Sequence, residues 1–230
     1  MDLRRADLAR ARPLPPGAAV SLAEPLEAVL RELRACRICR DAPLYQPPLP
    51  HEPRPVIQAS ATARLCIAGQ APGTRVHASG RPFTDPSGVR LRNWLGLDEA
   101  AFYDEARVAI VPMGHCFPGL DAKGGDRPPR RECAPHWRAR VLAALPEIEL
   151  VLAIGRYAQA WHLGPSEGAS LSQTMASWRE ILARPVMPRV LPLPHPSWRN
   201  NAWLTRNPWF EAELVPVLRA EIARLVSRAG

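Results

Sequence analysis

Residues 64–69 read Arg-Leu-Cys-Ile-Ala-Gly, a continuous apolar run of strand length that ends at a glycine. Three more runs of this kind lie at residues 108–112, 150–155 and 190–194. Apolar residues at helical spacing occur around and between these runs, at residues 22–33, 89–97, 132–145, 157–163, 175–182 and 209–226. Continuous apolar strands that alternate with helices are typical of a parallel sheet with both faces covered. We therefore predict an α/β fold with three layers, α/β/α, around a central, mainly parallel sheet of four strands.

The length of the chain and the composition of its N-terminus limit the class of protein that it can be. A chain of 230 residues is long enough to bury the hydrophobic core of one ordinary globular domain. We expect residues 20–230 to form a single domain behind a disordered lead at residues 1–19. The sequence has no apolar run of about 18 residues, the length that a spanning helix needs, so we expect no membrane partner. The N-terminus also lacks the apolar core of a secretory signal, which predicts a cytoplasmic protein.

The charge of the chain is strongly positive. Its formal net charge is +8 and its pI is about 10.0, a balance that favours partners carrying phosphate, such as DNA. Lys123 is the only lysine among 30 basic residues, and the chain contains 27 prolines. A biased genomic base composition would produce the same counts. Charge alone therefore leaves the partner open.

The loop after the first predicted strand is rich in glycine. In parallel sheets, ligands bind beyond the carboxyl ends of the strands. Here that position holds Gly69-Gln-Ala-Pro-Gly73, in which two glycines can bring backbone N–H groups close to a ligand. A tight strand-to-helix turn would use the same residues. Phe83 follows in a loop rich in Gly and Pro, where its ring could stack on a planar base or fill the core.

The loop after the fourth predicted strand reads His-Pro-Ser-Trp-Arg-Asn, residues 195–200. His195 lies between two prolines, which restrict its backbone and suit a side chain that must point at one atom. Trp198 and Arg199 offer a ring and a cation for bases and phosphates. A histidine held in a rigid turn is the alternative. Considered together, the glycine-rich loop and this loop indicate a binding site.

These motifs resemble, in this order and at these distances, the uracil-DNA glycosylase superfamily. The resemblance rests on residues 69–73, the Gly80-x-Pro82-Phe83 segment and residues 195–200, and it extends from about residue 35 to the C-terminus. The late motif is most similar to the single-strand-selective monofunctional uracil glycosylases. The front half looks more like the iron-sulfur bacterial branches.

The resemblance implies a DNA repair glycosylase that flips uracil out of single- or double-stranded DNA. We expect a monomer, and a monofunctional enzyme because the only lysine, Lys123, lies in a basic, glycine-rich loop and offers no activated amine. It implies that His195 donates a hydrogen bond to O2 of the departing base. The other roles implied are backbone donors at Gln70 and Ala71, a stacking ring at Phe83, a wedge at Trp198 or Arg199, and phosphate contacts at Ser197 and Asn200.

The sequence departs from the family pattern at two places. Gln70 and Ala71 stand where many relatives have an acid or asparagine that positions water. Gln70 can orient the water by hydrogen bonding but cannot take its proton, which leaves Asp85 and His77 as candidates for that step. Asp85 would equally serve as a helix cap. Residues 111–116 lack the asparagine that reads the pyrimidine edge, so His115 either replaces it or packs beside the cysteines. We therefore expect relaxed specificity, including xanthine or hypoxanthine.

Four of the five cysteines form two pairs that are distant in sequence. Cys36 and Cys39 are separated by two residues, and Cys116 and Cys133 follow much later. This arrangement resembles the iron-sulfur glycosylases and implies a 4Fe-4S cluster held by four thiolates. Tetrahedral zinc would accept the same ligands, and free thiols are a third possibility. Cys66 lies within an apolar run and is expected to pack in the core.

Two other classes of protein remain open. A noncatalytic, zinc-containing nucleic-acid-binding module would explain the cysteines, the basic charge and the Trp-Arg pair. An α/β enzyme that acts on a free nucleotide would explain the loops at the strand ends.

Overall fold

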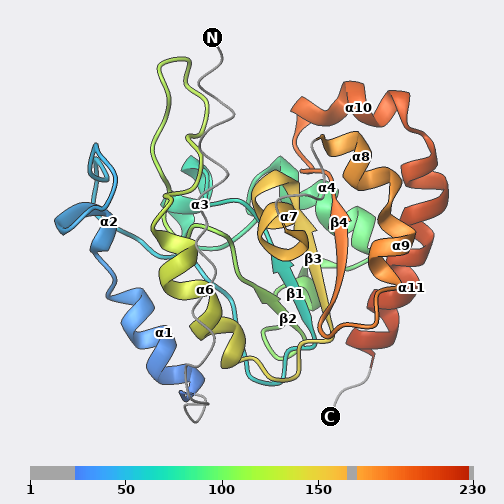
Figure 1. Ribbon diagram of the computed structural model, residues 1–230, viewed down its shortest axis with the longest axis horizontal. Coiled ribbons are helices and arrows are strands. Elements are labelled where there is room, and N and C mark those ends of the chain that lie inside the picture. Colours follow the sequence, from blue (N-terminus) through green and yellow to red (C-terminus); the bar gives the residue numbers. More distant parts are fainter. Residues whose placement is uncertain (1–23, 165–169, 228–230) are drawn as a thin grey trace.

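The computed structural model describes residues 24–164 and 170–227 of the chain (Figure 1). Its four strands are β1 (Leu65–Ala68), β2 (Val108–Ile110), β3 (Leu150–Ile154) and β4 (Arg189–Leu193). They form one sheet in the order β2-β1-β3-β4, and every neighbouring pair is parallel. The predicted sheet is confirmed. The lead at residues 1–19 lies outside the described residues, and no described helix is long and apolar enough to cross a membrane.

Helices cover both faces of the sheet. Successive strand side chains point to opposite faces, so Leu65 and Ile67 enter one apolar cluster while Cys66 and Ala68 enter the other. The first cluster includes residues of α4 (Pro86–Leu95) and α11 (Val215–Val226). The second includes residues of α1 (Leu26–Arg34), α6 (Cys133–Ala143) and α7 (Gly155–Leu163). The predicted three layers and the buried position of Cys66 are confirmed.

Shorter helices complete the layers. They are α2 (Ile38–Asp41), α3 (Thr74–Ser79), α5 (Glu99–Phe102), α8 (Leu171–Ala176), α9 (Trp178–Leu182), the 3-10 turn η1 (Trp198–Asn200) and α10 (Asn201–Arg206). The single helix predicted at residues 175–182 is therefore wrong. It is two helices, because the chain bends at Ser177, and α8 begins earlier, where the hydroxyl of Ser170 caps Gln173 N–H.

Both ends of the helical pattern differ in detail from the prediction. The last helix begins with a π-helical turn, η2 (Phe210–Leu214), before α11. Pro216 lies in the first turn of α11, and it has no N–H to continue an α-helical ladder into the preceding turn. At the other end, the helix predicted from residue 22 starts only at Leu26, after Pro25, and Glu24 before it accepts hydrogen bonds from Arg140.

Loops gather where the strands end. The loop between β2 and α6 rises beyond the sheet on the same side as α10, which follows β4 (Figure 1). Its outer part is a hairpin, residues 119–127, in which Leu120 and Asp126 form an antiparallel bridge. The loops at residues 69–73 and 195–200 leave the same edge of the sheet because all four strands are parallel. The fold therefore brings the predicted site loops to one end of the molecule.

Candidate functional site

A cavity of about 50 Å³ lies beyond the ends of β1, β2 and β4, with room for several water molecules. It brings together five residues that the sequence singled out: Gln70, Ala71, Phe83, Asp85 and His195. Ser87 and Pro112 also line it, and sequence reasoning did not single out either residue. Their only sequence signal was their place in the same loops. His195 and Phe83, which are far apart in the chain, thus share one cavity.

The glycine-rich loop forms one wall of the cavity through its backbone. Gly69 C=O and Gln70 C=O each accept a hydrogen bond of 2.9 Å, from Met113 N–H and Gly114 N–H respectively. A Cβ on Gly69 would lie 3.4 Å from the ring of Phe83, so the missing side chain lets the ring approach the loop. Within the described residues, the N–H groups of Gln70 and Ala71 make no hydrogen bond. They are free to donate to a ligand.

Phe83 is held in an unusual backbone conformation. Its φ is +54°, a left-handed value that costs a non-glycine residue about 1–3 kcal/mol. Gly88 makes this possible, because a Cβ there would lie 1.8 Å from the carbonyl oxygen of Phe83. The ring of Phe83 meets Phe102 edge to face at 6.0 Å, and the hydroxyl of Tyr103 donates to Pro82 C=O at 2.7 Å. The surroundings therefore fix the ring at the cavity.

Asp85 has a structural task as well as a place in the cavity. Its Oδ1 accepts a hydrogen bond of 3.1 Å from Gly88 N–H and caps α4. The helix-cap interpretation is confirmed. One carboxylate oxygen of Asp85 is thus already engaged by the backbone.

The loop around His195 sets the orientation of the imidazole. Ser197 N–H donates to His195 Nδ1 at 3.2 Å, so in the neutral ring the proton is carried by Nε2. The side-chain amide of Asn200 donates to His195 C=O at 2.7 Å. A Cβ on Gly155, at the start of α7, would lie 3.7 Å from His195 Cβ, so the helix packs closely against the loop. Nε2–H is the remaining donor of the ring.

The pKa of His195 is lowered, chiefly by burial and further by Arg199, while Asp85 opposes the shift. The ring is therefore neutral at pH 7. A neutral Nε2–H can donate to an oxygen that becomes negative during a reaction without placing a full cation in the cavity.

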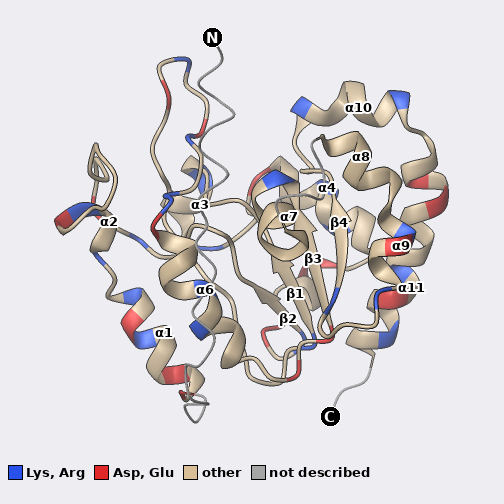
Figure 2. Cartoon of the chain, in the orientation of Figure 1, with Lys and Arg blue, Asp and Glu red and all other residues tan. Residues whose placement is uncertain are grey.

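Trp198 and Arg199 lie beside the cavity and do not line it. Trp198 is 73% exposed, and the guanidinium of Arg199 lies 5.8 Å from its ring centroid. Arg90 of α4 anchors the loop by donating to Ser197 C=O at 3.3 Å and to Asn201 Oδ1 at 2.8 Å. Basic residues also occur on the 119–127 hairpin and on α10 at this end of the molecule (Figure 2). Because the side-chain amide of Asn200 donates a hydrogen bond to His195 C=O, it stabilises the loop at residues 195–200.

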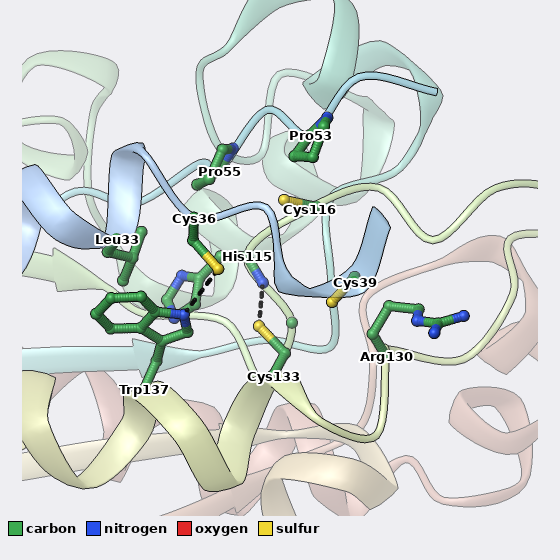
Figure 3. A pocket seen from close by; sticks show the side chains of 11 residues that line it. Leu33, Cys36, Cys39, Pro53, Pro55, His115, Cys116, Arg130, Cys133 and Trp137 are labelled. Carbon is green, nitrogen blue, oxygen red and sulfur yellow. Dashed lines mark hydrogen bonds between the residues drawn. The ribbon is translucent and has the colours of Figure 1, made fainter. Parts of the chain in front are cut away.

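A second cavity, of about 20 Å³, contains all four paired cysteines (Figure 3). Cys36 follows α1, Cys39 lies in α2, Cys116 follows β2 and Cys133 begins α6. Trp137 Nε1–H donates to Cys36 Sγ at 3.3 Å, and His115 N–H donates to Cys133 Sγ at 3.4 Å. The two sequence-distant pairs are therefore brought together around one space.

The side chain of His115 lines this second cavity, away from His195. Packing beside the cysteines is thus its position, and the alternative expectation of a base reader finds no support in this placement. His115 Nδ1 is buried with no hydrogen-bond partner among the described residues. His77 also lies elsewhere, with its ring centroid 4.5 Å from that of His51 and 5.6 Å from that of Phe117.

The donor set of the second cavity suits a group bound by thiolates. Burial raises the pKa of Cys39 to about 11 and that of Cys116 to about 12, and it also raises the pKa of Cys133. A bound cation would be needed to keep such thiols deprotonated. In the described residues, no three His, Cys, Asp or Glu side chains are placed to hold a single metal ion. The thiols surround a space, and N–H groups point at two of the sulfurs, as in metal-thiolate sites.

A comparison with protein families agrees with this geometry. The family model described as the uracil DNA glycosylase superfamily matches residues 57–219. The match includes the whole sheet, the loop at residues 69–73, Phe83 and the His195 loop, and it begins after Cys36 and Cys39. The chain therefore belongs to the uracil DNA glycosylase superfamily, whose members are glycosylases that act on DNA.

Proposed function

We propose that this glycosylase flips uracil and other deaminated bases out of DNA and hydrolyses the bond between the base and deoxyribose. The observation that carries the proposal is the cavity that His195 shares with Phe83 and the 69–73 loop. An enzyme that acts on a base within a strand must extrude it into such a cavity.

Catalysis then depends on the charge of the departing base. Breaking the bond leaves negative charge on the base, which spreads to O2 of a pyrimidine. The Nε2–H of His195 and the unpaired N–H groups of Gln70 and Ala71 are fixed donors for this charge. Donors held in place before the reaction stabilise the transition state more than the ground state. Phe83 supplies the stacking face for the flipped base.

The residue that lines the cavity after β2 favours a relaxed specificity for the base. Pro112 occupies the wall there and offers no side-chain donor or acceptor to a base. Strong discrimination requires polar groups that a wrong base leaves unpaired. We therefore propose that xanthine or hypoxanthine is accepted beside uracil.

A panel of labelled oligonucleotides tests this activity. Each carries one uracil, xanthine or hypoxanthine in single- or double-stranded form, and the released base is measured. Release of several bases supports the proposal, and strict activity on uracil contradicts the relaxed specificity. Strong release from free nucleotides, with no salt-dependent binding of undamaged DNA, would favour an enzyme acting on small molecules.

The enzyme is proposed to be monofunctional. Cleavage of the strand through a Schiff base requires an amine at the sugar. Lys123, the only lysine, lies on the hairpin and does not line the cavity. Strand nicks that form without alkali or heat would contradict this assignment.

We further propose that Cys36, Cys39, Cys116 and Cys133 hold a 4Fe-4S cluster, with zinc as the alternative. The cluster would supply a structural crosslink between the α1–α2 segment and α6, because hydrolysis needs no electron transfer. Support comes from the shared cavity, the N–H groups directed at two sulfurs and the unpaired Nδ1 of His115. Iron and acid-labile sulfide in a brown preparation support the cluster, whereas stoichiometric zinc in a colourless one supports the alternative.

A further inference from the structure

Hydrolysis also needs a group that takes a proton from the attacking water. Gln70 lies where many relatives place an acid or asparagine, and an amide cannot accept that proton at neutral pH. Asp85 lines the cavity, but one of its oxygens caps α4. His77 lies away from the cavity, in contact with His51 and Phe117. Of the expected candidates, Asp85 alone brings a carboxylate to the cavity, and one of its two oxygens is already engaged.

Asp126 does not itself line the cavity, but from a different loop it lies against Gly73, which does. Its Oδ2 lies 3.0 Å from the position that a Cβ on Gly73 would occupy, and Oδ1 lies 3.9 Å from it. Gly73 itself lines the cavity that contains His195. The missing side chain of Gly73 therefore makes room for a carboxylate next to the glycine-rich loop.

The hairpin that carries Asp126 is well fixed. Asp121 N–H donates to Gly125 C=O at 2.7 Å, and Arg127 N–H donates to Gly119 C=O at 3.0 Å. The side chain of Asp121 accepts hydrogen bonds of 2.8 Å from both Lys123 N–H and Gly125 N–H. In contrast, the Asp126 carboxylate makes no hydrogen bond or ion pair to another described residue. Asp121 is used to shape the hairpin, whereas Asp126 is left free.

The charges around Asp126 suit a base. Although Asp126 is an exposed residue, the loss of solvent where its carboxyl packs raises its pKa. Arg199 opposes this shift, while Asp85 and Asp121 add to it. A carboxylate with a raised pKa is a stronger base than an ordinary aspartate and accepts a proton more readily.

We propose that Asp126 is the general base of this glycosylase, an inference that rests on the proposed function. A water molecule at the rim gives a proton to the Asp126 carboxylate as its oxygen bonds to C1′ of deoxyribose. The bond between C1′ and the base breaks, and its electron pair leaves with the base, whose O2 accepts the Nε2–H of His195. Asp126 then releases the proton to solvent.

Chemical rescue tests this role in the full-length protein. Asp126→Ala should slow single-turnover release of uracil from a uracil-containing oligonucleotide by about 100-fold or more, with unchanged DNA affinity. Sodium formate should restore part of the rate in proportion to its concentration, because a small carboxylate can occupy the space beside Gly73. Sodium chloride at equal ionic strength should not. Asp121→Ala, which removes a neighbouring carboxylate from the same hairpin, should show no rescue by formate.

Each outcome is decisive. A rate for Asp126→Ala within about threefold of wild type, or a slow rate that formate does not restore, overturns the inference alone. Equal formate rescue of Asp121→Ala also overturns it, because the effect would then belong to the hairpin as a whole. Failure of the wild-type protein to release any base overturns the glycosylase proposal and this inference together.

Discussion

His195 and His115 lie in the two cavities and have contrasting surroundings. His195 is partly buried, its Nδ1 accepts the N–H of Ser197, and Arg199 and Asp85 lie within electrostatic reach. His115 is 2% exposed, its Nδ1 has no partner among the described residues, and four cysteines line its cavity. Burial lowers the pKa of both rings, to about 4 for His115. The comparison shows that neither burial nor pKa direction decides the role of a histidine; its partners do.

Removal of the imidazole from the first cavity should have the largest effect. We expect His195→Ala to slow base release by about 100- to 1000-fold, because loss of one fixed donor to a developing anion costs this much. DNA affinity should be retained in a fluorescence anisotropy titration. The matched control is His77→Ala, which removes a histidine outside the cavity. Equal rates for the two variants would contradict the role of His195.

Removal of a thiol from the second cavity should affect metal content and stability. We expect Cys39→Ala or Cys133→Ala to lose bound iron and to lower Tm by about 6–12 °C, which corresponds to about 3 kcal/mol. Cys66→Ala, which changes a buried cysteine outside the cavity, should retain the metal. Elemental analysis and thermal unfolding provide the measurements. Metal retained in the first two variants would show that these thiols are not ligands.

His162, a partly buried histidine that lines neither cavity, should make stability depend on pH. Its Nε2 accepts hydrogen bonds from Arg138, and burial followed by the charge of Arg138 lowers its pKa to about 3. The unfolded chain takes up a proton below about pH 6.5 and the folded chain does not, so stability falls as pH decreases from 6.5 toward 3.

We expect the free energy of unfolding to drop by about 2 kcal/mol from this group between pH 6.5 and 5. His162→Gln keeps an acceptor for Arg138 and should flatten the dependence by that amount. Urea unfolding at the two pH values measures it. An unchanged slope in the variant would assign the pH dependence to other groups.

The stacking ring should have the smallest of these effects. We expect Phe83→Leu to reduce kcat/KM for uracil release by about tenfold, because a base stacked on an aromatic ring gains about 1–3 kcal/mol. Phe117→Leu alters a ring that contacts His51 and His77 away from the cavity, and it should leave kcat/KM unchanged. If both variants behave alike, the ring of Phe83 does not contact the base.

Much of the fold could be predicted from local patterns. All four strands lie where apolar runs of strand length end at turns, because a parallel strand buried on both faces must be apolar throughout. Helix breaks were harder to predict. Ser177 interrupts an apolar pattern that is compatible with one continuous helix, and only the packing of α8 and α9 shows the bend.

The candidate site was predicted only in part, and the reason is physical. Motifs that lie directly after strands, such as residues 69–73 and His195, must meet because parallel strands end at one edge. The position of His115 could not be predicted in this way, because it depends on how the chain turns after β2. Asp126 carried no signal, since its approach to Gly73 depends on the path of a long hairpin loop.

The sequence by itself determined the parallel sheet, the pairing of the cysteines into two distant sets and the shared location of the strand-end loops. These follow from apolar periodicity and chain order, which are local properties. Only the tertiary structure decided that His115 faces the thiols, that Gly88 allows the left-handed backbone of Phe83, and that Asp126 lies against Gly73. The distance between these residues along the chain does not determine where their side chains point. The packing of the layers and loops decides these contacts instead.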